Sequence, residues 1–119
     1  MIQKASDLRQ SLEPNLKGGN DTVRLLHFLE AEDACGAGRL FGISIIPPGG
    51  SIGYHQHCGD FEIYYILKGS ARVVDNGNER RLNAGDAMLC RDGDAHSIEN
   101  AGTADLEYVA IILFNNQRG

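Results

Sequence analysis

Short apolar runs separated by turn-forming residues constrain the fold of this 119-residue chain more than any other feature. The chain contains 15 glycines, and a glycine or a cluster of Pro, Asn and Asp closes most of the runs. Runs of this length, rich in β-branched and aromatic residues, are typical of strands. We predict strands over residues 22–29, 39–46, 52–55, 62–67, 71–74, 79–82, 87–90, 96–99 and 106–114.

Two turn sequences separate these strands clearly. Asp75-Asn76-Gly77-Asn78 is a two-residue hairpin signal, because Asn-Gly accepts positive φ at both central positions. Pro47-Pro48-Gly49-Gly50 stops the strand before it, since proline cannot donate a hydrogen bond to a sheet. About nine short strands with regularly spaced turns predict an all-β sandwich or barrel.

The first 21 residues lack this rhythm, and we expect them to form a short N-terminal arm. Apolar residues recur there every three or four positions, at Ile2, Ala5, Leu8 and Leu12. This spacing predicts a short helix, with Ser6 as a candidate cap and an end before Pro14, followed by a Gly-rich loop. We therefore expect one domain, with an arm over 1–21 that packs on the barrel or on a partner, and a β-barrel over 22–119.

The strand that begins at Glu62 is largely apolar on both of its faces. One face carries Glu62, Tyr64 and Ile66, and the other carries Phe61, Ile63, Tyr65 and Leu67. Such a strand must be covered by the barrel interior on one side and by the arm or a second protomer on the other. We therefore expect a homodimer.

Composition argues against several classes of function. A net charge of −5 without any basic run argues against nucleic-acid binding. The first residues mix charges with few apolar side chains, so we expect neither a signal peptide nor a membrane anchor. Cys35, Cys58 and Cys90 form no close pair, and the simplest expectation is a reduced, cytoplasmic protein.

Two histidines and a glutamate lie close together in the sequence. His55 and His57 are two residues apart, so in an extended segment both imidazoles leave the same face, with backbones roughly 6.6 Å apart. Both rings can then take adjacent positions on one ion, and Glu62 adds a carboxylate at the start of the next run. His96 is a fourth candidate ligand, which spacing alone does not assign.

Three imidazoles and one carboxylate suit a divalent first-row ion such as Mn, Fe, Co, Ni, Cu or Zn. Four protein ligands on an octahedral ion leave two positions for water, dioxygen or a chelating ligand. A single carboxylate leaves a formal charge of about +1, which favours an oxalate-like, α-hydroxy or enediolate anion. Taken alone, each of these residues is more often a surface or hydrogen-bonded core residue. Burying four of them unpaired would cost several kcal/mol.

Two motifs in the chain resemble those of the cupin family. The first motif, G-x5-H-x-H-x4-E-x6-G, is met by Gly49, His55, His57, Glu62 and Gly69. The second, G-x5-P-x-G-x2-H-x3-N, is met by Gly85, Gly93, His96 and Asn100. Arg91 stands at its proline position, which affects only the rigidity of the turn. The motifs are 15 residues apart, as in small prokaryotic cupins, and the resemblance extends from about residue 24 to about residue 114.

The resemblance implies a double-stranded β-helix, the cupin jelly-roll barrel, with one divalent ion inside. It also implies that the ligands of this ion are His55, His57, Glu62 and His96. Asn100 shares the strand face of His96, and a turn or hydrogen-bonding role is favoured for it over ligation.

Several other residues have both a functional and a structural interpretation. Tyr64 could donate its hydroxyl to a metal-bound ligand or simply fill the barrel. Arg91 could clamp an anionic ligand, although an exposed turn arginine is the favoured alternative. Cys58 could be a reactive thiol beside the histidines, but it and Cys90 are more often small buried residues. For His27, a core or interface role is favoured over a fifth ligand.

Function is less constrained than fold, because cupins run many reactions in one barrel. One hypothesis is a metal-dependent enzyme on a small oxygen-rich anion, with dioxygenase-, decarboxylase- or sugar-phosphate isomerase-like chemistry. The other is a non-catalytic protein that binds a small carboxylate or sugar acid through the same ion. The lack of an obvious extra acid or base beside the four ligands favours the second hypothesis, and whether the chain is an enzyme stays open at this point.

Overall fold

The computed structural model describes residues 1–117, and ten strands lie within them. The strands are β1 (Arg9–Pro14), β2 (Thr22–His27), β3 (Gly38–Ile46), β4 (Ser51–Gln56), β5 (Asp60–Lys68), β6 (Ser70–Asp75), β7 (Asn78–Asn83), β8 (Ala87–Cys90), β9 (Ala95–Asn100) and β10 (Leu106–Phe114). Three short 3₁₀ helices are also present: η1 (Ala5–Asp7), η2 (Leu16–Gly18) and η3 (Ala31–Ala34). No helix within residues 1–117 is long and apolar enough to cross a membrane.

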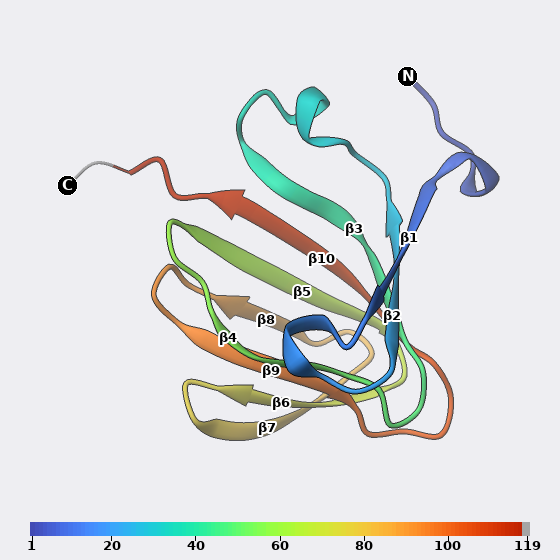
Figure 1. Cartoon of the computed structure of the whole chain (residues 1–119), viewed down its shortest axis with the longest axis vertical. Helices are drawn as coiled ribbons and strands as arrows, with labels where there is room; N and C mark the ends of the chain where they lie inside the picture. Colours follow the sequence, from blue (N-terminus) through green and yellow to red (C-terminus); the bar gives the residue numbers. More distant parts are fainter. Residues whose placement is uncertain (118–119) are drawn as a thin grey trace.

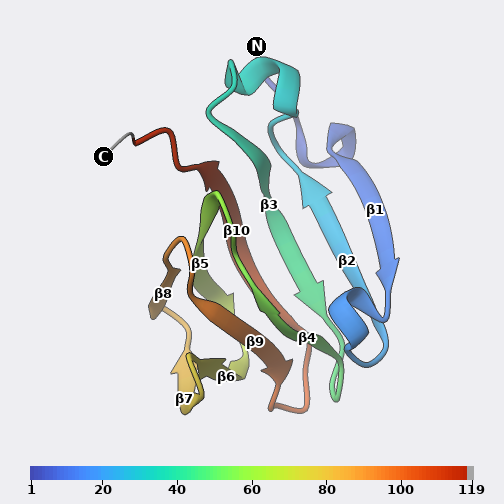
Figure 2. The same cartoon turned by 60° about the vertical axis from the view of Figure 1, so that its left-hand side comes forward.

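The strands form two antiparallel sheets (Figures 1 and 2). The larger sheet has the strand order β1-β2-β3-β10-β5-β8, and the smaller has the order β4-β9-β6-β7. Between β3 and β10 the chain passes repeatedly from one sheet to the other, which is the pattern of a jelly roll. The predicted all-β jelly-roll barrel is confirmed.

The nine strands expected from the sequence are all present, with bounds that differ by no more than two residues. The predicted hairpin joins β6 to β7, where Asp75 pairs with Asn78. Its two central residues, Asn76 and Gly77, have φ values of 48° and 84°. Both values lie in the left-handed region that Asn and Gly tolerate, so this turn was predictable from local chemistry alone.

The predicted helix in the arm is wrong over most of its length. Before Pro14 only residues 5–7 are helical, Lys4 rather than Ser6 precedes that turn, and the following segment forms β1. β1 pairs with β2 along its whole length. A short isolated helix is marginal in water, whereas a strand beside β2 gains inter-strand hydrogen bonds. Pro14 is tolerated because β1 is the edge strand. The division of the chain at residue 21 stays a prediction.

Apolar side chains from both sheets fill the space between them. The core consists of Val23, Leu25, Ile46, Ile52, Tyr64, Ile66, Ala71, Val73, Met88, Ile98, Leu106, Tyr108 and Ala110. Polar residues are buried as well, and four of them are predicted metal ligands or motif residues: His57, Glu62, His96 and Asn100. The interior therefore combines an apolar core with a cluster of ionisable groups.

The two faces of β5 differ in how they are covered. On the inner face, Glu62, Tyr64 and Ile66 are all buried, as expected for the barrel interior. On the outer face, Tyr65 is 47% exposed and Leu67 is 40% exposed. The arm does not cover this face, because β1 lies at the opposite end of the sheet from β5 (Figure 1). Of the two covers expected for the outer face, only a second protomer is left, and it stays a prediction.

Candidate metal centre

A β-bulge on β4 places two histidines opposite each other. Ile52 pairs with Ile98, but after one extra residue on β4 it is His55, not Tyr54, that pairs with His96 on β9. Tyr54 is turned outward and is 53% exposed. Bulges re-aim side chains in this way, and they are common beside functional sites. His55 and His96 therefore both reach the barrel interior.

Glycines allow the arm to lie against this bulge. The carbonyl oxygen of Lys17 in η2 is so close to Gly53 that a Cβ at this position would overlap it. Hydrogen bonds tie the next residues together, since the N–H of Ser51 donates to the Asn20 carbonyl oxygen and the N–H of Asn20 donates to Ser51 Oγ, both at 2.9 Å. The arm thus packs against β4, the strand that carries His55, and supports it.

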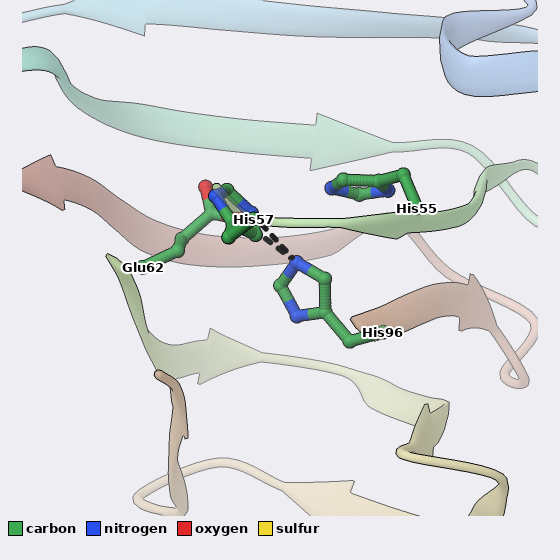
Figure 3. A group of neighbouring side chains, drawn as sticks. All are labelled: His55, His57, Glu62 and His96. Atoms are coloured by element: carbon green, nitrogen blue, oxygen red, sulfur yellow. Dashed lines mark hydrogen bonds and ion pairs between the residues drawn. The ribbon is translucent and has the colours of Figure 1, made fainter. Parts of the chain in front are cut away.

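The predicted ligands converge on one point inside the barrel (Figure 3). The Nε2 atoms of His57 and His96 are 3.2 Å apart, and Oε1 of Glu62 lies 3.2 Å from the first and 3.1 Å from the second. Together with His55, each residue offers one donor atom within 4.8 Å of the others. Two donors bound about 2.1 Å from one ion and at right angles are about 3.0 Å apart, so this triangle matches adjacent positions on a metal.

Hydrogen bonds on the far ring nitrogen orient two of the imidazoles. Nδ1 of His55 is 2.7 Å from the carbonyl oxygen of Gly53, which can only accept, so Nδ1 carries the proton and Nε2 is free. Nδ1 of His57 is 2.6 Å from Oδ1 of the buried Asp60, with the same consequence. Nδ1 of the buried His96 has no hydrogen-bond partner within residues 1–117.

The electrostatics of the cluster favour a cation at its centre. Burial raises the pKa of Glu62, but the hydrogen bonds with His57 and His96 outweigh burial and lower this pKa to about 2. The hydrogen bond with Glu62 raises the pKa of His57 against the effect of burial, whereas burial lowers the pKa of His55. Glu62 thus places a negative charge where the ring nitrogens meet, and either a proton on His57 or a bound cation can neutralise it.

These residues fit a divalent transition-metal ion. Imidazole nitrogens and one carboxylate oxygen are the donor set that such ions accept, and the partners of the two Nδ1 atoms hold the rings in the required tautomer. His55, His57, Glu62 and His96 could therefore hold one such ion, as predicted. When bound, the ion supplies Lewis acidity and positive charge.

The cluster lies at the wall of a cavity of about 520 Å³ that is lined by strands of both sheets and by the arm. Tyr64 also lines this cavity, and its ring stacks on His96 with a centroid distance of 5.1 Å. Burial and, secondly, the charge of Glu62 raise the pKa of Tyr64 well above its usual value, so the hydroxyl stays protonated. Tyr64 therefore remains a candidate hydrogen-bond donor to a small molecule bound at the metal.

The other predicted contact, Arg91, is exposed and is not among the residues that line the cavity. It begins the turn before β9, where its N–H donates to Oδ2 of Asp94 at 3.1 Å and its carbonyl oxygen accepts from the Asp94 N–H at 2.9 Å. Gly93 supplies a φ of 93°. These hydrogen bonds hold the turn without the proline of the motif, and the position of Arg91 fits an exposed turn arginine.

The remaining candidates lie around the cluster rather than in it. Cys58 is exposed and lines the cavity, whereas Cys90 is fully buried, and burial raises its pKa to about 12, which makes this thiol unreactive. His27 also lines the cavity, but it is hydrogen-bonded to Ser11 Oγ at 2.8 Å and lies outside the four-residue cluster. His27 is therefore not placed as a fifth ligand.

Asn100 has the hydrogen-bonding role expected for it. Its side-chain amide donates to the carbonyl oxygens of Ile46 and Ala104, both at 2.8 Å, and its Oδ1 accepts from the Gly102 N–H at 2.9 Å. The residue joins β9 to the end of β3 and to the following loop. It therefore supports the strand that carries His96.

Sequence reasoning missed two charged residues at the site. Asp60 holds His57, and its other carboxylate oxygen accepts a hydrogen bond from Nε of Arg39 at 2.9 Å. The position of Asp60, three residues after His57, could have suggested such a contact. Arg39 is 21 residues away from Asp60 in the chain, and no local pattern points to it.

Comparisons with known proteins identify the family. A model described as a cupin domain matches residues 42–112. A Thermotoga maritima relative described as an oxalate-binding protein is 41% identical over 113 residues, which cover 95% of this chain and 93% of the relative. The crystal structure of a predicted oxalate decarboxylase from Thermotoga maritima has a TM-score of 0.92 and 40% identity, covering 97% of this chain and 100% of that one.

More distant structures share the fold alone. The cupin domain of Schizosaccharomyces pombe Cnp3 has a TM-score of 0.72 at 15% identity, covering 88% of this chain and 69% of that one. Motifs, fold, donor cluster and relatives thus agree. The chain belongs to the cupin family.

Proposed function

We propose that this cupin binds a small, oxalate-like carboxylate through one divalent transition-metal ion held by His55, His57, Glu62 and His96. The observation that carries the proposal is the triangle of donor atoms from His57, Glu62 and His96, which are 3.1 to 3.2 Å apart at the wall of a cavity. A divalent metal ion would bind all three donor atoms at this spacing.

The charge of the centre favours an anion. Glu62 is the single carboxylate of the four-residue cluster, so a divalent ion would keep a formal charge of about +1. An anion with two adjacent oxygen donors suits the positions that four protein ligands leave on an octahedral ion. The descriptions of the relatives point the same way, since one is an oxalate-binding protein and another is a predicted oxalate decarboxylase.

Binding without turnover is favoured over catalysis because the ionisable groups around the cluster are engaged elsewhere. Asp60 accepts hydrogen bonds from His57 and Arg39, and His27 is bonded to Ser11. Burial raises the pKa of the Tyr64 hydroxyl well above its usual value, so this group is a poor proton donor and is not ionised to act as a base. Decarboxylase-, dioxygenase- or isomerase-like chemistry is the alternative, and it would require one of these groups to be released when the ligand binds.

The test combines metal analysis with ligand titration. Protein purified without a chelator should contain one transition-metal ion per chain, and oxalate titrated into manganese-loaded protein should bind saturably without release of carbon dioxide or uptake of dioxygen. His57→Ala should abolish metal uptake, whereas Tyr54→Phe, on the opposite side of the strand, should not. A His55→Ala/His57→Ala double variant that retains stoichiometric metal would contradict the site, and carbon dioxide release would identify an enzyme.

The outer face of the larger sheet supports the proposal of a homodimer. Half-buried or exposed apolar side chains line up there across β3, β10, β5 and β8: Ile43, Ile63, Tyr65, Leu67, Leu89, Val109 and Ile111. The ion pair of Lys68 with Glu107 borders this set, which we call the outer apolar face. A contiguous patch of this kind is typical of protein interfaces, and two copies of the chain can bury it against each other. Sedimentation at micromolar concentration should show a dimer.

We also propose a cytoplasmic location. All three cysteines are free, and two of them are exposed, which is the state that a reducing compartment maintains. Fractionation of cells that express the tagged protein tests this proposal, and recovery outside the cytoplasm would contradict it.

A further inference from the structure

A second β-bulge aims a charged side chain at the cavity. Leu40 on β3 pairs with Ile112 on β10, and the next pair is Gly38 with Leu113, so Arg39 has no partner on β10. In a regular strand the side chains of Arg39 and Leu40 would point to opposite faces, but here both line the cavity. The bulge thus brings a cation to the space beside the metal centre.

One edge of this guanidinium group is already held. Nε of Arg39 donates to Oδ2 of Asp60 at 2.9 Å, while Oδ1 of the same carboxylate accepts from His57. The Asp60 side chain is 9% exposed, whereas that of Arg39 is 50% exposed. Within the described residues 1–117, neither Nη group of Arg39 has a hydrogen-bond partner, so a fixed pair of donors faces solvent or ligand.

The cavity is larger than an oxalate-like ligand requires. Oxalate occupies roughly the space of four water molecules, or about 120 Å³ at about 30 Å³ for each water. The cavity measures about 520 Å³, which is in the range that holds larger organic ligands. A ligand that fills this site therefore extends beyond a two-carbon head at the ion.

We propose that Arg39 binds a second acidic group of the ligand, whose first carboxylate lies at the metal ion. This inference rests on the proposed function and names its ligand class: an organic diacid longer than oxalate, with a chelating carboxylate at one end. A guanidinium group presents parallel N–H donors to both oxygens of a carboxylate, and Asp60 reduces the cost of ordering the side chain.

Other charged groups along the cavity are less suited to this contact. Lys17 and Glu13 of the arm carry opposite charges, and Lys17 is exposed without an ion pair in the part of the chain that the structure describes. His27 is bonded to Ser11, and burial lowers its pKa, so it is neutral at physiological pH. Arg39 is therefore the cation that the fold holds in place.

Matched ligands isolate the second contact. Calorimetry on manganese-loaded protein compares malate with 2-hydroxybutanoate, which has the same α-hydroxy acid head and a methyl group in place of the distal carboxylate. A second pair, 2-hydroxyglutarate and 2-hydroxypentanoate, is one methylene longer. At least one diacid should bind about 10- to 100-fold more tightly than its monoacid, as expected for a charged hydrogen-bonded pair.

Substitutions assign this preference to a residue. In protein saturated with manganese, Arg39→Gln should bring the ratio of diacid to monoacid affinity close to one, whatever change the lost hydrogen bond to Asp60 makes in the manganese dissociation constant. Arg39→Lys should keep part of the preference for the diacid, because the positive charge remains but the two parallel N–H donors of the guanidinium group are lost. Arg91→Gln, a matched change outside the cavity, should keep all of it.

Three outcomes would overturn the inference. They are equal binding of diacid and monoacid in both pairs, loss of the preference in Lys17→Gln rather than in Arg39→Gln, and equal weakening of monoacid and diacid by Arg39→Gln. The last would mean that Arg39 only supports Asp60 and His57. Oxalate binding in the same samples shows that the proposed function survives, whereas failure of oxalate and both monoacids to bind refutes the proposed function as well.

Discussion

The two faces of β5 are both largely apolar, but one is buried and the other is partly exposed. On the inner face, Glu62 and Tyr64 meet partners from β9 and β10 and are almost fully buried. On the outer face, Tyr65 and Leu67 are about as apolar but remain 47% and 40% exposed. The difference shows that one chain satisfies only the inner face. The outer face is where the proposed second copy of the chain would bury further apolar area.

The largest effect is expected on the inner face at the metal. Glu62→Gln keeps the size of the side chain but removes the one negative charge of the cluster, so the affinity for a divalent ion should fall by more than 100-fold. Titration with a fluorescent metal indicator measures this change. Ile63→Val, the adjacent position on the outer face, is the matched control and should leave the metal affinity unchanged. If Glu62→Gln bound metal as tightly as the unmodified protein, Glu62 would not be a ligand.

Charges on the outer face should break self-association without touching the metal. A Tyr65→Lys/Leu67→Lys variant would place like charges in a self-complementary interface, and the dissociation constant of the dimer should rise by about 100-fold. Sedimentation measures the constant, and metal content reports on the inner face. An unchanged oligomeric state would place the interface elsewhere, and lost metal binding would show that the two faces are coupled.

Substitution of Gly53 tests the close packing of η2 against the β4 bulge that precedes His55. Gly53→Ala places a methyl group against the Lys17 carbonyl oxygen, so either η2 or the bulge before His55 must move. The free energy of unfolding should fall by about 2 kcal/mol in chemical denaturation. Gly102→Ala is the matched control, because its Cβ would meet only ordinary contacts and should cost less. Equal losses in the two variants would argue against a special role for the close approach at Gly53.

Substitution of Asp60 tests the hydrogen bond that orients the His57 ring. Asp60→Asn weakens the hydrogen bond that fixes the His57 ring, and metal affinity should fall by about tenfold. The absorption spectrum of cobalt-loaded protein should also change, because the orientation of the His57 ring alters the ligand field. Asp105→Asn, at an exposed site, should change neither quantity. An unchanged cobalt spectrum together with unchanged affinity would remove Asp60 from the site.

The smallest effect concerns Cys58, which lines the cavity but lies outside the donor cluster. Cys58→Ser should change metal affinity by less than about twofold, because the thiol is not in the donor cluster and does not orient any of its four residues. A larger loss of affinity would return Cys58 to the list of functional residues.

Much of this architecture was predictable because it depends on local chemistry. Strand positions followed from apolar runs and turns, and the β6–β7 hairpin followed from the tolerance of Asn76 and Gly77 for positive φ. The arm was predicted wrongly because its apolar spacing suggested a helix, whereas the backbone of β2 supplied hydrogen-bond partners for a strand. Local spacing says nothing about such distant partners.

The sequence by itself determined the fold class and, through two motifs that resemble those of cupins, which residues form the candidate donor cluster. Only the tertiary structure decided that His55 rather than Tyr54 faces His96, and that Arg39 reaches the cavity. Both outcomes depend on β-bulges. A bulge arises from how two distant strands are paired, and one extra residue reverses the face to which the following side chains point.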